Sequence, residues 1–391
     1  MEKSQLAKLS LEKLQSYCEN ESYKGWDPFD GLNSRLFSSL PFFKHSKIAR
    51  LIFLQFTKRS FINFRRLFLV EKEYNAKGIA LFLSGYCKLY GNTPDIRLRK
   101  KIKFLADKLL SLRSRDYSGS CWGYNFDWQA RAFFQPRLTP TIVATTYCVS
   151  ALIDSFEVLQ DEKYLRVALD SQHFVLKDLN RSPDETGDFA FSYSPLDTTQ
   201  IFNASLLASR LLSAVYLYDK NDELIDAAKT SISFCCKHQK DNGAWSYGTL
   251  PFHDWIDNFH TGYNLECIFA YQEATNDFTY SDFMKKGMEF YAENFFSEKG
   301  IPRYYHNHTY PVDLHNTAQL IITASRLGEF DARRKLIDLV LLWTINNMQD
   351  ESGYFFYQKR KYYTNKIPYM RWTQAWMFYG LSAYIAQLNE V

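Results

Sequence analysis

The segment Asp241–Glu266, DNGAWSYGTLPFHDWIDNFHTGYNLE, determines how the rest of the chain is interpreted. It contains three glycines, three aspartates, two tryptophans, two tyrosines and two histidines. The stretches on either side have the apolar spacing of amphipathic helices. Because packing alone seldom requires such a mixture, we interpret the segment as either a buried polar network or one wall of a binding site.

The same pattern of helix, glycine- and aromatic-rich loop, and helix recurs along the chain. Aligning one aromatic residue from each loop, at positions 122, 191, 245, 304 and 355, gives spacings of 69, 54, 59 and 51 residues. A repeat of this length indicates stacked supersecondary units. Within each unit the apolar residues follow helical spacing, so the chain is predicted to be almost entirely helical.

Closure of these units in a ring is the predicted architecture. Inner helices are predicted near residues 76–90, 140–156, 198–218, 259–274, 313–327 and 371–388. Helices over residues 48–68 and 96–114 flank the first of them. The fold class is therefore all-α, an (α/α)6 toroid whose aromatic loops converge on one cavity, with an open solenoid as the alternative. We expect a toroid domain over residues 46–391, preceded by an N-terminal extension or lid over residues 1–45.

Composition excludes several classes of function. The formal net charge is +4 over 391 residues, and no run of five basic residues occurs, so nucleic acid is not an expected partner. Seven scattered cysteines without a CxxC motif fit a reducing compartment. No apolar run reaches about 18 residues, and no signal peptide is recognisable, so we expect a cytoplasmic protein without stable membrane insertion. The aromatic share of 17% favours surfaces that stack on sugar rings.

Several motifs resemble those of known toroid proteins. QKDNGAWSYG at residues 239–248 and QDESGYFFYQ at 349–358, with RWTQAWMFYGLSAYI at 371–385, resemble repeats of six-hairpin carbohydrate enzymes and of terpenoid-cyclase toroids. YKGWDPFDGLNSRLF, KRSFINFRRLF, FHTGYNLE and RWTQAW resemble a toroid family encoded among bacterial capsule and O-antigen polysaccharide genes. The resemblance implies polysaccharide biosynthesis as the context, with an oligo- or polysaccharide substrate and glycosyltransferases as further partners.

The candidate catalytic residues come from the opening segment and from the loop that follows its helix. His260 and Tyr263 are three residues apart, so they share one face of the predicted helix. His253 and Asp254 lie in the preceding loop, where a histidine–carboxylate pair can form an oriented base or simply a surface pair. The predicted catalytic residues are His260, Tyr263, His253, Asp254 and Tyr304.

A second set of loop residues is predicted to bind the substrate. Arginine can hold a carboxylate through a bidentate fork, and tyrosine and tryptophan can stack on sugar faces. Plainer roles are also open: Asp257 can cap a helix, Asp127 can pair with Arg131 between loops, and the tryptophans can fill the core. The predicted set is Trp122, Tyr124, Asp127, Arg131, Trp245, Tyr247, Asp257, Arg303, His306, Arg371, Trp372 and Gln374.

Two further features concern metal binding and the N-terminal segment. Five of the eight histidines lie between His253 and His315, but no HExxH or comparable spacing occurs, so neither a metal nor another cofactor is predicted. The turn-rich piece KGWDPFDGLNS, with Asp27 and Asp30, either folds over the pocket as a lid or caps the open end of the helical stack.

Two classes of function fit these residues. One is a carbohydrate-active enzyme that removes the C5 proton of a uronate, as a C5-epimerase or a lyase does, with a histidine or tyrosine base and a cation beside the carboxylate. Alternatives are a sugar 2-epimerase, which RWTQAW distantly resembles, and a glycoside hydrolase, for which Asp197, Asp254, Asp257 and Glu266 could supply two carboxylates. The other class is a non-catalytic glycan-binding or scaffold protein of a polysaccharide assembly complex. A terpenoid cyclase is disfavoured because no DxDD motif occurs.

Overall fold

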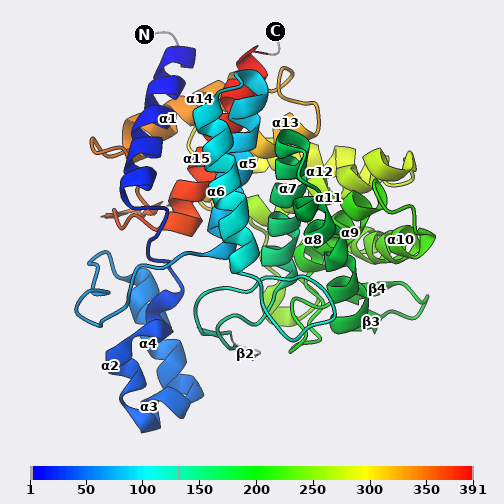
Figure 1. Cartoon of the computed structure of the whole chain (residues 1–391), viewed down its shortest axis with the longest axis horizontal. Coiled ribbons are helices and arrows are strands. Elements are labelled where there is room, and N and C mark those ends of the chain that lie inside the picture. Colours follow the sequence, from blue (N-terminus) through cyan, green and yellow to red (C-terminus); the bar gives the residue numbers. More distant parts are fainter. Residues whose placement is uncertain (1–2, 131–132, 390–391) are drawn as a thin grey trace.

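A closed barrel of inner helices forms the centre of the molecule (Figure 1). The computed structural model describes residues 3–130 and 133–389. Within these residues each of six inner helices packs against the next, and the last packs against the first. The six are α5 (Ala76–Asn92), α7 (Ile142–Leu159), α9 (Phe202–Tyr216), α11 (Asn258–Thr275), α13 (His315–Arg326) and α15 (Trp376–Asn389). The structure confirms the predicted (α/α)6 toroid.

Outer helices cover the barrel, and the first of them in sequence completes the circle. They are α1 (Lys3–Asn20), α6 (Ile96–Ser111), α8 (Glu162–His173), α10 (Asp222–Lys237), α12 (Ser281–Asn294) and α14 (Arg334–Met348). Helix α1 packs against α14 and α15, so the two ends of the chain together form one helical hairpin. The predicted boundary at residue 46 therefore does not separate the N-terminal segment from the toroid.

Glycines explain why the loop motif repeats. Gly243 and Gly353 occupy equivalent positions in QKDNGAWSYG and QDESGYFFYQ, with φ of +88° and +103°. A Cβ atom at either position would lie 2.3 Å from a backbone carbonyl oxygen, that of Lys286 in α12 or that of Lys13 in α1. Both the left-handed conformation and the close approach require glycine. Each loop thus abuts the next outer helix, and α1 takes the place of that helix for the last loop.

The inner and outer helices differ in how they are buried. Helix α7 is buried on nearly every side, whereas α6 buries one stripe that contains Ile102, Leu105 and Leu109. Helix α7 is long and apolar enough to cross a membrane by composition, but it packs between α5 and α9 as a barrel helix. Side chains cap both types of helix, as Thr141 does for α7 and Asp95 for α6.

Short strands and turns stiffen the loops at one end of the barrel. Strands β1 (Trp128–Gln129) and β2 (Phe134–Gln135) pair antiparallel, as do β3 (Arg181–Pro183) and β4 (Phe189–Phe191). A third sheet has the order β5 (Val312–Asp313), β6 (Gln358–Lys359) and β7 (Thr364–Asn365), and it joins two successive loops. Short helical turns complete these connections: η2 (Phe174–Asp178), η3 (Pro251–His253) and η4 (Met370–Ala375).

A small lobe projects from the same end of the barrel (Figure 1). It contains η1 (Asp30–Asn33), α2 (Arg35–Ser38), α3 (Pro41–His45) and α4 (Lys47–Arg59). The helix predicted over residues 48–68 is therefore shorter, and it lies in this lobe instead of the toroid. The reason is a local aromatic core: the chain turns back after α4, and Phe53 stacks on Phe37 and contacts Phe68, at ring distances of 4.5 and 5.2 Å.

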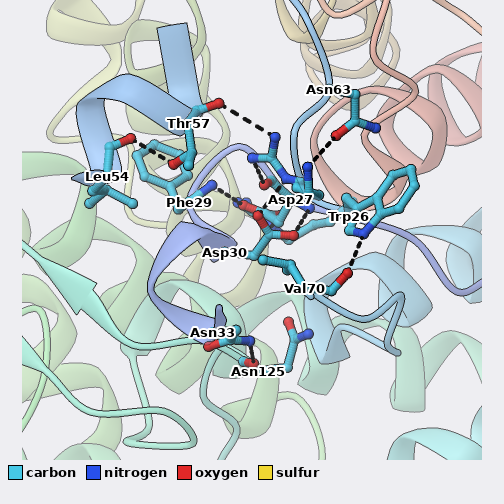
Figure 2. A network of polar contacts seen from close by, with 12 residues as sticks. Trp26, Asp27, Phe29, Asp30, Asn33, Leu54, Thr57, Asn63, Val70 and Asn125 are labelled. Atoms are coloured by element: carbon cyan, nitrogen blue, oxygen red, sulfur yellow. Dashed lines mark hydrogen bonds and ion pairs between the residues drawn. The ribbon is translucent and has the colours of Figure 1, made fainter. Parts of the chain in front are cut away.

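Polar contacts order the lobe and join it to the toroid, as Figure 2 shows around Trp26, Asp27 and Asp30. The Arg65 guanidinium donates to the Asp30 carboxylate and to the Asp27 backbone carbonyl, both at 2.7 Å. The Asn33 amide donates to the backbone carbonyl of Asn125 in the first aromatic loop, at 2.8 Å. Arg65 thus holds the N-terminal segment together, and Asn33 joins it to the first aromatic loop.

Candidate active site

The loops and the lobe enclose a cavity of about 700 Å³ at one end of the barrel. Its size is in the range of small-molecule sites. The barrel helices contribute its polar floor, and the lobe contributes Phe29 and residues of α4 to its mouth. Aromatic side chains dominate the walls: Tyr124, Phe126, Trp128, Phe133, Tyr193, Tyr247, Trp255, Phe259, Tyr304, Tyr305 and Trp372. Such a lining suits stacking on sugar rings.

His260 lines this cavity from the first turn of α11, and Asp257 orients its imidazole. The Nδ1 atom lies 2.9 Å from both carboxylate oxygens of Asp257. A carboxylate only accepts hydrogen bonds, so Nδ1 carries the proton and Nε2 is left able to accept one from a ligand. Asp257 occupies the N-cap position of α11, but its side chain makes no capping hydrogen bond to a backbone N–H of the helix. The carboxylate does not make the capping bond that was one of the roles open to it from the sequence, because it bonds the ring of His260, one turn on.

A second polar group in the floor joins three inner helices. The Tyr263 hydroxyl lies 2.8 Å from Nε2 of His315 and accepts from the Lys77 amino group at 3.2 Å. Burial lowers the pKa of Lys77 and the pKa of His315 well below their usual values, with cationic neighbours adding to both effects. Burial also raises the pKa of Tyr263 well above its usual value. Burial therefore favours the uncharged form of all three groups.

Arg371 lines the cavity, but a carboxylate of the chain already occupies its guanidinium. Its Nε and Nη2 atoms donate to the two oxygens of Asp27 at 2.6 and 2.8 Å. Both side chains are only 5% exposed. The substrate carboxylate that we expected Arg371 to hold is thus replaced by Asp27 of the N-terminal segment, which lies 344 positions away in sequence.

Three cations that form no ion pair within the described residues lie at the mouth instead. Lys58 and Arg59 of α4 line the cavity, and Arg360 lines an adjoining groove of about 460 Å³ between the lobe and the third sheet. Within the described residues, none of the three forms an ion pair with a carboxylate, and neither hollow has an aspartate or glutamate in its lining. Burial lowers the pKa of Lys58 to about 8, so it is mostly charged at neutral pH. The mouth therefore favours a negatively charged ligand.

The carboxylates considered for a hydrolase are engaged elsewhere. Asp197 accepts from Ser194 and Thr199 within its own turn. Glu266 is buried below the floor with Arg210 and Arg326. Asp254 is exposed and bonds Lys240 and Ser246, so the predicted pair with His253 does not form. The described residues thus do not assemble two carboxylates across the cavity.

The predicted residues divide between the cavity and its surroundings. His260, Tyr263, His253, Tyr304, Tyr124, Tyr247, Arg371 and Trp372 lie in the lining. Trp122 and Trp245 are instead buried behind the loops, where their indole N–H groups donate to the carbonyls of Leu109 and Cys235. These carbonyls belong to outer helices, so both tryptophans fill the space between the helical layers, which is the plainer role open to them from the sequence.

Other predicted binding residues serve the loops themselves. Asp127 accepts from the backbone N–H of Arg137, and Arg303 donates to the carbonyl of Asn294. His306 lies against the carbonyl of Ile256. Gln374 bonds both the N–H and the carbonyl of Phe355, so it fixes the last aromatic loop. Arg303 therefore does not converge with His260 as predicted, because its side chain turns back to the end of α12. Arg131 lies outside the described residues.

Several residues of the cavity were not predicted from the sequence. Lys77 is a single charged side chain in the apolar run of α5, and that isolation was the signal that could have identified it. His315 is the first residue of α13 and His260 lies in the first turn of α11, so the helical repeat relates them. Lys58 had no such signal, because the helix that carries it was predicted as part of the toroid. Within the described chain, no three histidine, cysteine, aspartate or glutamate side chains are grouped as metal ligands.

Several solved structures share this fold at low sequence identity. A cellobiose 2-epimerase from Bacillus thermoamylovorans is 11% identical, with a TM-score of 0.63 over 80% of this chain and 88% of that one. A GH76 α-mannanase from Bacteroides thetaiotaomicron is 13% identical, with a TM-score of 0.60 over 81% and 88%. A protein from Listeria innocua is 13% identical, with a TM-score of 0.63 over 100% and 98%. No protein-family profile and no curated protein sequence matches the chain.

Proposed function

We propose that this protein is a carbohydrate-active enzyme that removes a proton from a sugar carbon adjacent to a carbonyl or carboxylate group. The observation that carries the proposal is the His260–Asp257 pair, which leaves Nε2 of His260 as an oriented base in an aromatic cavity. The fold is also that of a cellobiose 2-epimerase, whose similarity is structural only. A hydrolase is less well supported, since the lining of the described cavity lacks paired carboxylates.

The preferred substrate is a uronate within an oligo- or polysaccharide. Lys58, Arg59 and Arg360 offer unpaired positive charge where an acidic sugar would enter. His260 takes the C5 proton. One of these three cations stabilises the negative charge that develops on the carboxylate of the sugar. The Tyr263 hydroxyl, backed by His315 and Lys77, returns a proton to complete C5 epimerisation. Loss of the C4 substituent at the same stage would give the lyase product.

A sugar 2-epimerase is the second candidate. The observation that favours it is the placement of His260 and His315 at the starts of neighbouring inner helices, both in the cavity lining. In that reaction the proton leaves C2, next to the C1 carbonyl of an open-chain sugar, and acid–base groups act on both faces. This reaction requires a substrate with a reducing end, and it gives no role to the cations at the mouth.

The cellular setting that we infer is the biosynthesis of a bacterial capsule or O-antigen polysaccharide, in the cytoplasm and beside glycosyltransferases. Support comes from the motifs quoted above and from seven cysteines that are all free thiols. In this setting a non-catalytic glycan-binding scaffold remains the competing function. Turnover distinguishes the two, because a scaffold binds a glycan without exchanging its protons.

The test is solvent isotope exchange. We would incubate the protein in D₂O with uronate-containing oligosaccharides or with neutral reducing disaccharides, and locate incorporated deuterium by NMR and mass spectrometry. Deuterium at C5 of a uronate supports the preferred reaction, and deuterium at C2 of a reducing sugar supports the second candidate. Glycan binding without any exchange would leave the scaffold as the function.

Variants assign the roles. His260→Ala should lower the exchange rate by roughly 10² to 10⁴-fold, the usual contribution of a general base. Asp257→Asn should lower it by about 10- to 100-fold and alter its pH profile, because Asp257 acts through the tautomer of His260. His306→Ala is the matched control, since this histidine lies outside the cavity lining. Tyr263→Phe is less informative, because it also leaves His315 without its partner.

A further inference from the structure

The lobe combines exposed apolar side chains with an unbroken excess of positive charge. Between Gly31 and Val70 the sequence has eight lysines and arginines and no aspartate or glutamate. Of the 25 large apolar side chains that are exposed in the described chain, 11 lie within this segment. Monomeric proteins rarely expose such a concentration unless the surface binds something.

The exposed residues form an ordered surface on α3 and α4. Ile48 and Ile52 are 70% and 65% exposed, and with Phe56 they follow i, i+4, i+8 spacing, so they form one stripe of α4. Leu54 faces the interior of the lobe. On α3, Phe42 is 91% exposed. The exposed apolar stripe is thus separate from the face of α4 that packs into the core of the lobe.

Neighbouring segments extend the same surface. Phe61 and Ile62 follow α4 and are exposed. The ring of Phe61 contacts that of Tyr363, at 5.3 Å, in the β6–β7 hairpin, where Tyr362 is 86% exposed and follows Lys361. We call α3, α4 and these two neighbouring segments the docking surface.

The charges identify the partner. Lys44 and Lys47 flank the apolar stripe, are exposed, and form no ion pair within the described residues. We propose that the docking surface binds an anionic lipid bilayer, with Phe42 and Ile48 in the acyl boundary and the lysines at the headgroups. Amphipathic helices with basic polar faces and aromatic or aliphatic apolar faces bind bilayers in this way.

The alternative occupants fit less well. A second copy would bring two basic surfaces together, because a two-fold interface pairs a patch with itself. A protein partner would ordinarily offer pockets for protruding side chains and carboxylates for the lysines, whereas a fluid bilayer accepts both without a matched shape.

Bilayer binding would place the cavity at the lipid surface. Leu51, Gln55 and Lys58 lie on a stripe of α4 adjacent to Ile48 and Ile52, and they line the cavity. The mouth of the cavity would then meet saccharides carried on membrane lipids. This inference does not depend on the proposed reaction, because it concerns only the outer surface of the lobe.

The experiment is vesicle flotation of the full-length protein. Vesicles of phosphatidylcholine alone are compared with vesicles that contain about one third phosphatidylglycerol. We expect binding to the anionic vesicles that is at least about tenfold stronger and that weakens as salt is raised. Phe42→Ser/Ile48→Ser should remove binding, and Lys44→Glu/Lys47→Glu should reduce it by about fivefold or more per lysine.

Matched controls separate this surface from general hydrophobicity. Phe278→Ser and Leu217→Ser change residues that are 63% and 51% exposed outside the lobe and its neighbouring hairpin, and they should leave flotation unchanged. Circular dichroism checks that each variant is folded. The proposal is overturned if the wild-type protein does not float, if the apolar or charge variants float as well as wild type, or if zwitterionic vesicles bind equally. Self-association that Phe42→Ser/Ile48→Ser abolishes, without vesicle binding, would assign the surface to a second copy instead.

Discussion

Asp27→Asn tests whether the N-terminal segment completes the cavity through a buried ion pair. The substitution keeps the shape of the side chain but removes the charge that faces Arg371. In the native protein two hydrogen bonds of 2.6 and 2.8 Å join the pair, and both side chains are 5% exposed. A guanidinium would then remain buried without a counterion, near Lys77 and His315, whose pKa values it already lowers.

The expected loss in the free energy of unfolding follows from these contacts. Each hydrogen bond to a charged group contributes about 1.5–3 kcal/mol, and asparagine can retain one neutral bond of about 1 kcal/mol. The net loss should be about 3 kcal/mol in the free energy of unfolding, at the lower end of the range for broken buried pairs. Asp27→Asn/Arg371→Gln leaves no unpaired charge, so it should be more stable than the sum of the two single changes predicts, by about 2 kcal/mol.

The assay is urea unfolding followed by circular dichroism, arranged as a double-mutant cycle. Glu71→Gln is the control, because Glu71 pairs with Arg35 on the exposed surface of the same lobe. Glu71→Gln should lower the free energy of unfolding by less than about 1 kcal/mol. The single variant should also gain affinity for an acidic sugar, since Arg371 regains a free fork in the cavity. A loss below about 1 kcal/mol for Asp27→Asn, or the absence of coupling in the cycle, would refute the reasoning.

Two further predictions concern charge. Because burial lowers the pKa of Lys58 to about 8, binding of acidic oligosaccharides should weaken as pH rises through 8, while Lys58→Arg should bind equally at pH 7 and 9 by calorimetry. Neutral oligosaccharides are the control, and a wild-type affinity that is constant over this range would rule out a role for Lys58. Glu266→Gln should lower the free energy of unfolding by about 3–5 kcal/mol, because Arg210 and Arg326 lose their buried counterion. A Glu266→Gln variant that is as stable as wild type but inactive would show that Glu266 acts in the reaction and is not a structural counterion.

Local sequence patterns were sufficient to predict the architecture. Apolar residues at helical spacing, glycine-marked loops and a recurring period are local signals, and they located the inner helices α5, α7, α9, α11, α13 and α15. The face shared by His260 and Tyr263 was predictable for the same reason, since positions i and i+3 meet on any helix, and both side chains line the cavity. The repeat also indicated where the loops would converge.

Only the tertiary structure decided which charges meet. Arg371 pairs with Asp27 across 344 residues, and α1 packs against α15 to form the last hairpin because the barrel closes on itself. No local sequence pattern predicts either contact. Asp257 shows the same limit at short range, because its capping position was predictable but the competing bond to His260 depends on how the loop places both groups. Periodicity fixes which face a side chain occupies, whereas its partner depends on distances in space that separation along the chain does not determine.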